Sequence, residues 1–274
     1  MKAPSADEPS CGAYPLRLHW WKAQPNFGDA LSPLILSHVS GRRVDHASVD
    51  EADVFGLGSL LQIVRRNFDT PRDGAKPVIW GSGLLRPAGG RAFLKNIEIA
   101  LLRGPVTAAL LGVETDAFGD PGLLVNEVLP SDAPRGDKIG IVPHHTLADA
   151  PELLDLVASD SAYVLIDPRD PVEHVCAAIA SCAHVFASSL HGLITADAYG
   201  VANTWVAPDG QGRLKFHDYA ASVGRDMRVP IALADIPAAR KPDAPLAYHD
   251  GFAACRAALI EHFPAALYAH EGAA

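Results

Sequence analysis

The sequence predicts an α/β protein built from two doubly wound, Rossmann-like lobes that face each other across a cleft. The first observation behind this prediction is a recurring order of a short apolar run, a Gly or Ser, and a helical pattern. The second is a polar stretch rich in Asp, Pro and Gly at residues 130–138, after which the same order restarts. A chain of 274 residues has room for two small domains. We therefore expect lobes over residues 14–134 and 137–274.

The first lobe is expected to contain four strands with helices between them. The apolar runs that predict strands are residues 16–20, 53–57, 77–80 and 97–102. Helical patterns follow the first, second and fourth runs, at residues 30–39, 59–66 and 106–111. Strands that alternate with helices are typical of a parallel sheet.

The second lobe repeats this order. Strands are expected at residues 139–142, 163–166, 184–187 and 201–206. Helices are expected at residues 172–181, in the segment that ends at Tyr199, and at about residues 252–263, where the chain packs back on the body. Ligands of such sheets bind beyond the carboxyl ends of the strands, so the loops at those ends are the candidate sites.

Composition limits the classes of function. The 23 Lys and Arg residues against 32 Asp and Glu give a net charge of −9, which argues against a general nucleic-acid-binding protein. An anionic small molecule would need a locally positive site. The four cysteines show no CxxC pair and indicate free thiols in a reducing compartment. No apolar run approaches the roughly 18 residues of a membrane span, and no signal peptide is recognisable, so we expect a cytoplasmic protein.

The most informative loop is the segment from Ser188 to Gly192, with the order Ser-Ser-Leu-His-Gly. A buried strand here delivers two hydroxyls and an imidazole to the start of a helix, whose free N–H groups favour an anion. His191 beside that anion would exchange protons near neutral pH. In the alternative interpretation, Ser189 is a helix cap and His191 is a hydrogen-bonded loop residue.

Arg103 ends a second strand, immediately before Gly104 and Pro105. Its guanidinium is expected to grip a carboxylate or phosphate at two points. The alternative is a surface ion pair with a nearby acid such as Asp120. In the turn after the first strand, Asp29 is expected to cap the helix, and Asn26 is a candidate for hydrogen bonding to a substrate.

The second lobe offers further contacts to an anionic ligand. His144 is a candidate substrate or phosphate contact, and His145 adjoins it without a third ligand at metal spacing, so no metal site is expected. Arg213 and Lys215 supply two cations in a loop after a strand. They are interpreted as a local counter-charge, with a solvated basic face as the alternative.

Taken in order, these segments resemble the polysaccharide pyruvyl transferases of bacteria, and among them the xanthan-type ketal pyruvate transferases. The segments that carry the resemblance begin at Asn26, Val78, Arg103, Gly119, Ile141, Ser188 and Arg213. They read Asn-Phe-Gly-Asp-Ala-Leu-Ser, Val-Ile-Trp-Gly-Ser-Gly, Arg-Gly-Pro-Val-Thr, Gly-Asp-Pro-Gly-Leu-Leu, Ile-Val-Pro-His, Ser-Ser-Leu-His-Gly-Leu-Ile, and Arg-Leu-Lys-Phe with Asp-Tyr. Each alone is common, whereas the ordered set is specific.

The resemblance implies transfer of a pyruvyl group from phosphoenolpyruvate to two hydroxyls of a glycan sugar, which gives a cyclic ketal in exopolysaccharide biosynthesis. It implies a fold similar to GT-B glycosyltransferases, catalytic roles for His191 and Arg103, and no cofactor beyond the donor itself. The acceptor is expected to be a lipid-linked oligosaccharide, which allows at most peripheral association with the inner face of the cytoplasmic membrane. The alternatives are a GT-B-type glycosyltransferase that uses a nucleotide-sugar donor and a non-catalytic sugar-binding module.

One position departs from many members of the resembled family. Those members carry Arg where this chain has Ser189, although the xanthan-type branch shares the Ser. The anion contact would then come from Arg213 or Lys215. The remaining candidates for substrate binding are Asn26, Ser82, His144 and Ser188.

Overall fold

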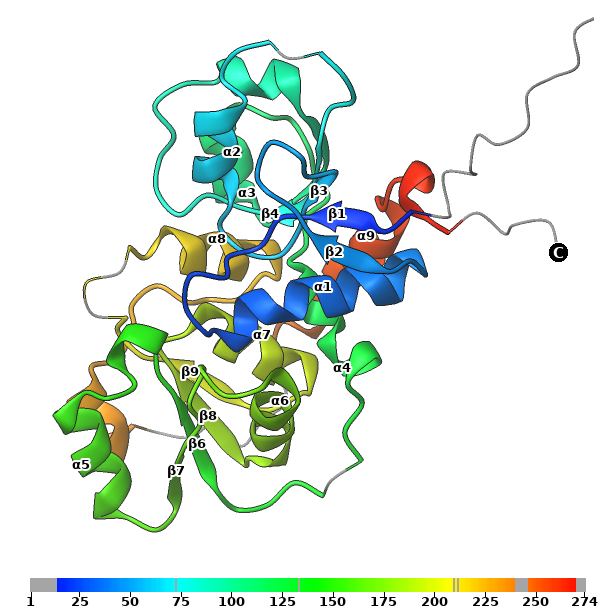
Figure 1. The fold of residues 1–274 in the computed structure, drawn as a ribbon. Coiled ribbons are helices and arrows are strands. Elements are labelled where there is room, and N and C mark those ends of the chain that lie inside the picture. Colours follow the sequence, from blue (N-terminus) through cyan, green and yellow to red (C-terminus); the bar gives the residue numbers. More distant parts are fainter. Residues whose placement is uncertain are drawn as a thin grey trace, which may run out of the picture.

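The structure is a computed structural model that describes residues 14–71, 73–132, 134–208, 210, 212–239 and 246–269. It has two lobes, each built on a parallel sheet with helices packed around it (Figure 1). Three of the four cysteines, Cys176, Cys182 and Cys255, are buried free thiols, and Cys11 lies outside the described residues. Within the described ranges, no helix is both long and apolar enough to cross a membrane.

The sheet of the N-terminal lobe has the strand order β2-β1-β3-β4-β5, and all of its pairs are parallel. Its strands are β1 (Leu16–Leu18), β2 (Val44–His46), β3 (Val54–Phe55), β4 (Val78–Ser82) and β5 (Glu98–Leu102). Its helices are α1 (Phe27–Ser40), α2 (Leu61–Asn67) and α3 (Pro105–Leu111), with the short 3-10 helix η1 (Ala92–Asn96) before β5.

The sheet of the C-terminal lobe has the strand order β7-β6-β8-β9, again with parallel pairs. Its strands are β6 (Ile139–Val142), β7 (Tyr163–Leu165), β8 (His184–Ala187) and β9 (Asn203–Trp205). The helices are α5 (Pro151–Ser159), α6 (Val172–Ser181), α7 (Leu190–Ala198), α8 (Leu214–Ser222) and α9 (His249–Glu261). Between the lobes run η2 (Pro121–Leu124) and α4 (Val125–Val128), while η3 (His145–Leu147), η4 (Leu233–Ala238) and η5 (Ala265–Leu267) are short 3-10 segments.

The predicted α/β class with two parallel sheets is confirmed, and each of the eight predicted runs contains a strand. One strand and three α-helices were missed, namely β2, α4, α5 and α8, as were the short 3-10 helices. The segment that carries Lys215 was expected to be a loop, but it is the first turn of α8. The last helix was expected to pack back on the body of the protein. Helix α9 does so, because it returns from the second lobe and packs beside the first sheet (Figure 1). There the indole Nε1 of Trp80 donates to the carbonyl of Leu259 at 2.9 Å.

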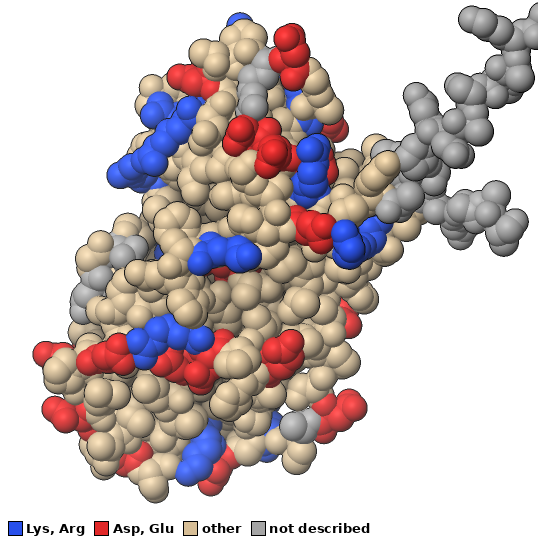
Figure 2. All heavy atoms as spheres, viewed as in Figure 1, with Lys and Arg blue, Asp and Glu red and all other residues tan. Residues whose placement is uncertain are grey.

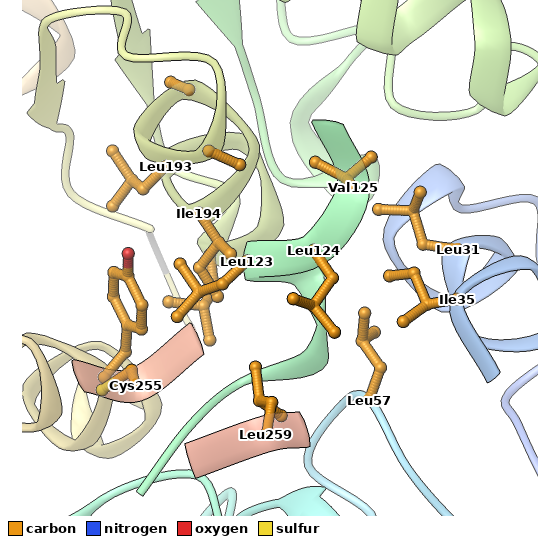
Figure 3. Close-up of a cluster of buried hydrophobic side chains, with 14 of the residues drawn as sticks. Leu31, Ile35, Leu57, Leu123, Leu124, Val125, Leu193, Ile194, Cys255 and Leu259 are labelled. Carbon is orange, nitrogen blue, oxygen red and sulfur yellow. The ribbon is translucent and has the colours of Figure 1, made fainter. Parts of the chain in front are cut away.

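One hydrophobic core joins the two lobes. Helix α1 lies between them, and its Leu31 and Ile35 face Leu124 of η2 (Figure 3). Leu193 of α7 and Leu259 of α9 belong to the same buried cluster, so all four segments share it. Side chains buried this completely each contribute roughly 1.5–3 kcal/mol to folding. The lobes are therefore held in one arrangement by packing, which fixes the loops at their facing edges.

Asp120 gives the fold a pH-dependent stability that can be measured. It is fully buried, its Oδ1 accepts from the Gly122 amide at 2.9 Å, and its Oδ2 has no hydrogen-bond partner within the described part of the chain. Burial raises the pKa of Asp120 to about 6, against the opposing charge of Arg103. The folded protein therefore holds this proton between about pH 4 and pH 6, where the unfolded chain has lost it. Protonation of Asp120 therefore adds to the free energy of unfolding in full below about pH 4, and this contribution disappears as the pH rises through about 6.

We expect Asp120→Asn to remove this pH dependence, because the amide stays neutral at every pH. The loss of stability between about pH 4.5 and 7.5 should be smaller than in the wild type by about 2 kcal/mol, because most of the difference in proton binding between the folded and unfolded states falls within this range. Urea unfolding at both pH values measures it. Equal pH dependence in the two proteins would show that Asp120 ionises normally.

Candidate active site

The facing edges of the two sheets enclose a cleft of about 500 Å³. From the N-terminal lobe it is lined by the loop after β1, the start of α1, the turn before α2 and the loop after β4. The C-terminal lobe contributes the loop after β6, the start of α7 and the start of α8. The lining residues that carry polar or charged groups are Gln24, Asn26, Asp29, Ser59, Gln62, Arg66, Arg86, His144, His145, Thr146, Ser189, His191 and Lys215.

The start of α1 forms one corner of the cleft. Asn26, not Asp29, is the helix cap: its Oδ1 accepts from the Gly28 amide at 3.2 Å. The Nδ2 of Asn26 donates to Oδ2 of Asp29 at 2.7 Å, so both polar groups of Asn26 are used within the protein. The prediction that Asp29 caps this helix is therefore wrong. Asn26, three residues earlier, already accepts the hydrogen bond from an amide of the first turn.

His191 projects from the first turn of α7 into the same cleft. Ser189 caps this helix by accepting from the Gly192 amide at 3.3 Å, as the alternative interpretation of the loop predicted. Among the described residues, Nε2 of His191 is buried without a hydrogen-bond partner. Burial, followed by the charges of Lys215 and Arg103, lowers the pKa of His191 to about 3. The imidazole of the free protein is therefore neutral at pH 7, with an unpaired nitrogen.

Lys215 is the cation that the C-terminal lobe contributes to the cleft. It lies in the first turn of α8, and burial together with the charge of Arg103 lowers its pKa to about 8, so most of it is charged at pH 7. Arg213, its sequence-predicted partner, is exposed and does not line the cleft. Of the two cations that could replace the missing arginine at Ser189, only Lys215 is thus placed beside His191.

The two adjacent histidines form the floor next to α7. The rings of His144 and His145 contact each other with centroids 4.2 Å apart and a tilt of 36° between their planes, and both residues line the cleft. Burial, with the Lys215 charge, lowers the pKa of His144 to about 4. Ser188 does not reach the cleft; its Oγ accepts from the backbone amide of His144 at 2.9 Å and so positions the histidine loop.

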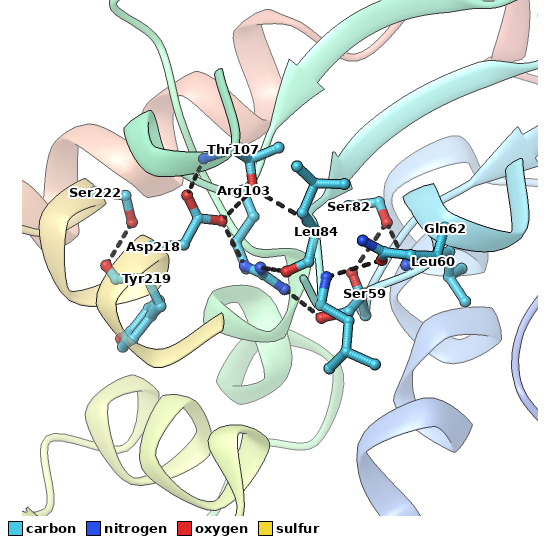
Figure 4. A network of polar contacts seen from close by, with 12 residues as sticks. Ser59, Leu60, Gln62, Ser82, Leu84, Arg103, Thr107, Asp218, Tyr219 and Ser222 are labelled. Atoms are coloured by element: carbon cyan, nitrogen blue, oxygen red, sulfur yellow. Dashed lines mark hydrogen bonds and ion pairs between the residues drawn. The ribbon is translucent and has the colours of Figure 1, made fainter. Parts of the chain in front are cut away.

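Arg103 lies directly behind the cleft wall and has no exposed surface. Its Nε donates to Oδ2 of Asp218 at 2.9 Å, and its Nη1 donates to Oγ of Ser59 at 2.8 Å (Figure 4). Asp218 also accepts from the amide and the hydroxyl of Thr107, each at 2.7 Å. The acid that pairs with Arg103 is therefore Asp218 of α8, on the other lobe, and not Asp120. Arg103 reaches the cleft only through Ser59.

Ser82 is also below the surface of the cleft. Its Oγ donates to the carbonyl of Gly58 at 3.0 Å and accepts from the amide of Leu60 at 3.1 Å, and the side chain is fully buried (Figure 4). It fixes the turn that carries Ser59. The structure thus places this predicted substrate contact one layer away from the cleft.

Two glycines of the sequence motifs are explained by close approach between the lobes. A Cβ on Gly28 would lie 2.2 Å from Nδ1 of His191, so the imidazole rests directly on the backbone of α1. A Cβ on Gly104 would lie 2.1 Å from the carbonyl oxygen of Asp218. Both contacts join the two lobes, and neither leaves room for a side chain.

The structure therefore brings Asn26, His144, Ser189, His191 and Lys215 together in one cleft. It sets Arg103, Ser82 and Ser188 behind the cleft wall and Arg213 outside it. Sequence reasoning missed Ser59, which carried no motif signal, and the cleft residues Trp21, Arg66 and Arg86. It placed Asp218 in a segment that carries the resemblance but gave it no role. Trp21 is 46% exposed, which is unusual for an indole in a folded protein and marks the cleft rim.

A second pocket of about 480 Å³ lies within the C-terminal lobe. Its walls are mainly apolar and include Ile141, Leu153, Phe186 and Leu233, with Ser188 at its edge. None of the described residues that line it is a Lys, an Arg or a His, which distinguishes it from the cleft between the lobes. No group of three or more His, Cys, Asp or Glu side chains arranged to hold a metal occurs in the described ranges.

Comparison with known proteins adds to this geometry. The family model of polysaccharide pyruvyl transferases matches residues 10–210. The chain is 32% identical over 231 residues to the succinoglycan biosynthesis protein ExoV of Rhizobium meliloti (strain 1021), covering 79% of this chain and 69% of that protein. It is 31% identical over 161 residues to the uncharacterized protein L143 of Acanthamoeba polyphaga mimivirus, covering 54% of this chain and 55% of the viral protein. The aligned region thus spans about half the length of the viral relative.

Proposed function

Because this chain belongs to the polysaccharide pyruvyl transferase family, we propose that it transfers the pyruvyl group of phosphoenolpyruvate to two hydroxyls of a glycan sugar. The product is a cyclic ketal in an exopolysaccharide precursor, carried as a lipid-linked oligosaccharide at the inner face of the membrane. The observation that carries this proposal is the cleft, which places Lys215, the start of α7 and an unpaired imidazole on one wall. We also propose that the two lobes are arranged as in GT-B glycosyltransferases.

The donor binds against the C-terminal wall of the cleft. Phosphoenolpyruvate carries a phosphate and a carboxylate, and the cleft must be positive to accept them in a chain of net charge −9. Figure 2 shows how this charge is distributed: acidic side chains form a band across the C-terminal lobe, and basic ones gather on the flank of the N-terminal lobe. Lys215 and the free amides at the start of α7 hold the anionic groups, and Arg103 adds positive charge from behind Ser59.

His191 exchanges the proton that the reaction needs. Burial is the main cause of the low pKa of His191, and the charges of Lys215 and Arg103 add to it. A negative donor beside the imidazole offsets these charges and favours its protonated form, so we propose that His191 takes up a proton when the donor binds. It then delivers this proton to C3 of the enol, which leaves C2 open to attack by a sugar hydroxyl. Phosphate leaves from a tetrahedral centre when the second hydroxyl closes the ring, a step that needs no further cofactor.

The acceptor sugar binds against the N-terminal wall. The exposed ring of Trp21 offers an apolar face to a sugar, and Gln24 in the same loop offers hydrogen bonds. The deciding experiment measures phosphate release from phosphoenolpyruvate with a panel of acceptor glycans. Calorimetric titration with nucleotide sugars tests the alternative donor class. Binding of a nucleotide sugar together with no phosphate release from phosphoenolpyruvate would favour a glycosyltransferase.

Replacing Lys215 with Ala tests the donor site. We expect the KM for phosphoenolpyruvate to rise by about 10- to 100-fold, because a hydrogen bond to a charged group contributes about 1.5–3 kcal/mol. Arg213→Ala is the matched control, since Arg213 is two residues away, exposed and outside the cleft. Equal donor KM values in the two variants would remove Lys215 from the donor site.

A further inference from the structure

The cleft contains one carboxylate among many cationic or neutral-base groups. Of the described residues that line it, Asp29 alone is acidic, while Lys215, Arg66, Arg86 and three histidines surround it. A carboxylate beside the site of an anionic donor weakens donor binding by charge repulsion. The carboxylate of Asp29 is therefore expected to have a structural or chemical role that outweighs this loss of donor affinity.

A purely structural role does not account for this carboxylate. The start of α1 is already capped by Asn26, so the side chain of Asp29 is not needed to hold the helix amides. Asp29 forms no ion pair with any described residue, and its single hydrogen bond there is the one that Oδ2 accepts from Asn26. Its Oδ1 lies beside the turn at Gly58, where a Cβ would be 3.6 Å away, on the N-terminal wall of the cleft. One carboxylate oxygen is thus fixed by Asn26, and the other has no hydrogen bond to a described residue and belongs to a side chain that lines the cleft.

We propose that Asp29 is the general base that removes the proton from the acceptor hydroxyl as it attacks the pyruvyl carbon. This inference rests on the proposed function and names a catalytic residue within it. The donor occupies the wall formed by α7 and α8, so the acceptor hydroxyls approach from the opposite wall, where Asp29 is placed. Burial raises the pKa of Asp29 to about 6, with the Asn26 hydrogen bond and the Lys215 charge opposing the rise. A base of this strength is ionised at pH 7 and accepts a proton far more readily than an ordinary carboxylate.

The protons and electrons of the reaction balance with Asp29 in this role. The O–H bond of the first hydroxyl breaks, its proton goes to Asp29, and its oxygen bonds to C2. The electrons of the C2–C3 double bond take the proton held by His191, which makes C3 a methyl group. The oxygen of the second hydroxyl replaces the C2–phosphate bond, and its proton leaves with the phosphate. Transfer of the Asp29 proton back to His191 restores both groups.

The pH dependence follows from the groups around Asp29. The other charged or titratable groups that line the cleft within the described residues are Lys215 of α8, His191 of α7, His144 and His145 of the loop after β6, Arg66 of α2, and Arg86 of the loop after β4. Burial lowers the pKa of Lys215 to about 8 and raises that of Asp29 to about 6. Protonation of Asp29 removes the base, so turnover at saturating donor should fall as the pH drops through about 6.

Asp29→Asn tests the proposal, because the amide oxygen can still accept from Asn26 while the base is lost. We expect kcat for phosphate release from phosphoenolpyruvate to fall by about 10²- to 10⁴-fold, with the donor KM unchanged or lowered. The decline of kcat below pH 6 should disappear, and Asp29→Glu should recover part of the activity. Asp155→Asn, at an exposed site on α5, is the matched control.

The outcomes separate this inference from the proposed function. An Asp29→Asn variant within threefold of wild-type kcat would overturn the role of Asp29 and leave the proposed function intact. A variant with normal kcat and only a changed donor KM would assign Asp29 to binding and equally overturn it. If the wild type releases no phosphate with any acceptor, the proposed function and this inference both fail.

Discussion

His191→Ala is expected to lower the turnover of pyruvyl transfer by about 10²- to 10⁴-fold while the protein remains folded. The size of the effect reflects loss of the group that delivers the proton to C3. Two neighbouring groups of the cleft are poorly suited to substitute: His144 has its Nδ1 bonded to Thr146, and Lys215 holds its own proton up to a pH of about 8. The free protein should lose little stability, because Nε2 of His191 has no hydrogen-bond partner to leave unsatisfied among the described residues.

The measurement is phosphate release at saturating phosphoenolpyruvate, with donor binding followed separately by calorimetry. Donor affinity should change little, which separates a chemical role from a binding role. His174→Ala is the matched control, since His174 is exposed on α6 with 73% of its side-chain surface accessible. Wild-type turnover in a folded His191→Ala variant would remove His191 from the mechanism.

Much of the fold was predictable because its elements carry strong local signals. The strands β6 and β8 and the helix α6 begin and end where their apolar runs do, since both faces of a parallel sheet are buried and its strands are uniformly apolar. The edge strand β2 was missed because Val44–His46 is short and polar, and its burial is low. Helix α8 was missed because its segment mixes charged and apolar residues without a clear helical face, and packing against α3 stabilises it.

The candidate site was predictable only in part, for a physical reason. Residues in motifs at strand ends reach the same edge of a sheet, which is why His144, Ser189 and His191 could be assigned to one site. The partner of Arg103 could not be identified in the same way, because Asp218 is 115 residues away and meets it only when the lobes pack together. Asp29 was misassigned for a local reason: both Asn26 and Asp29 are good capping residues, and the choice between them depends on the dihedral angles of the turn.

The buried pair of Arg103 and Asp218 gives the largest expected effect on stability. Both side chains are completely buried, and the pair links β5 of one lobe to α8 of the other. Replacing Asp218 with Ala leaves the guanidinium without its counter-charge and the amide of Thr107 without its acceptor. Removing one member of such a pair typically costs 3–5 kcal/mol, since an uncompensated charge remains in a medium of low polarity.

We therefore expect Asp218→Ala to lower the free energy of unfolding by about 3–5 kcal/mol, measured by urea denaturation. The double variant Arg103→Ala, Asp218→Ala should be less destabilised than the two single variants added together, because neither charge is then left alone. Arg17→Ala is the control, as Arg17 forms an ion pair with Asp53 at 2.6 Å while 55% of its side chain is exposed, and exposed pairs contribute roughly 0–1 kcal/mol. If Asp218→Ala costs no more than this control, the pair does not hold the lobes together. The position of Lys215, on the same helix as Asp218, would then have to be fixed by the packing of Phe216 and Tyr219 alone.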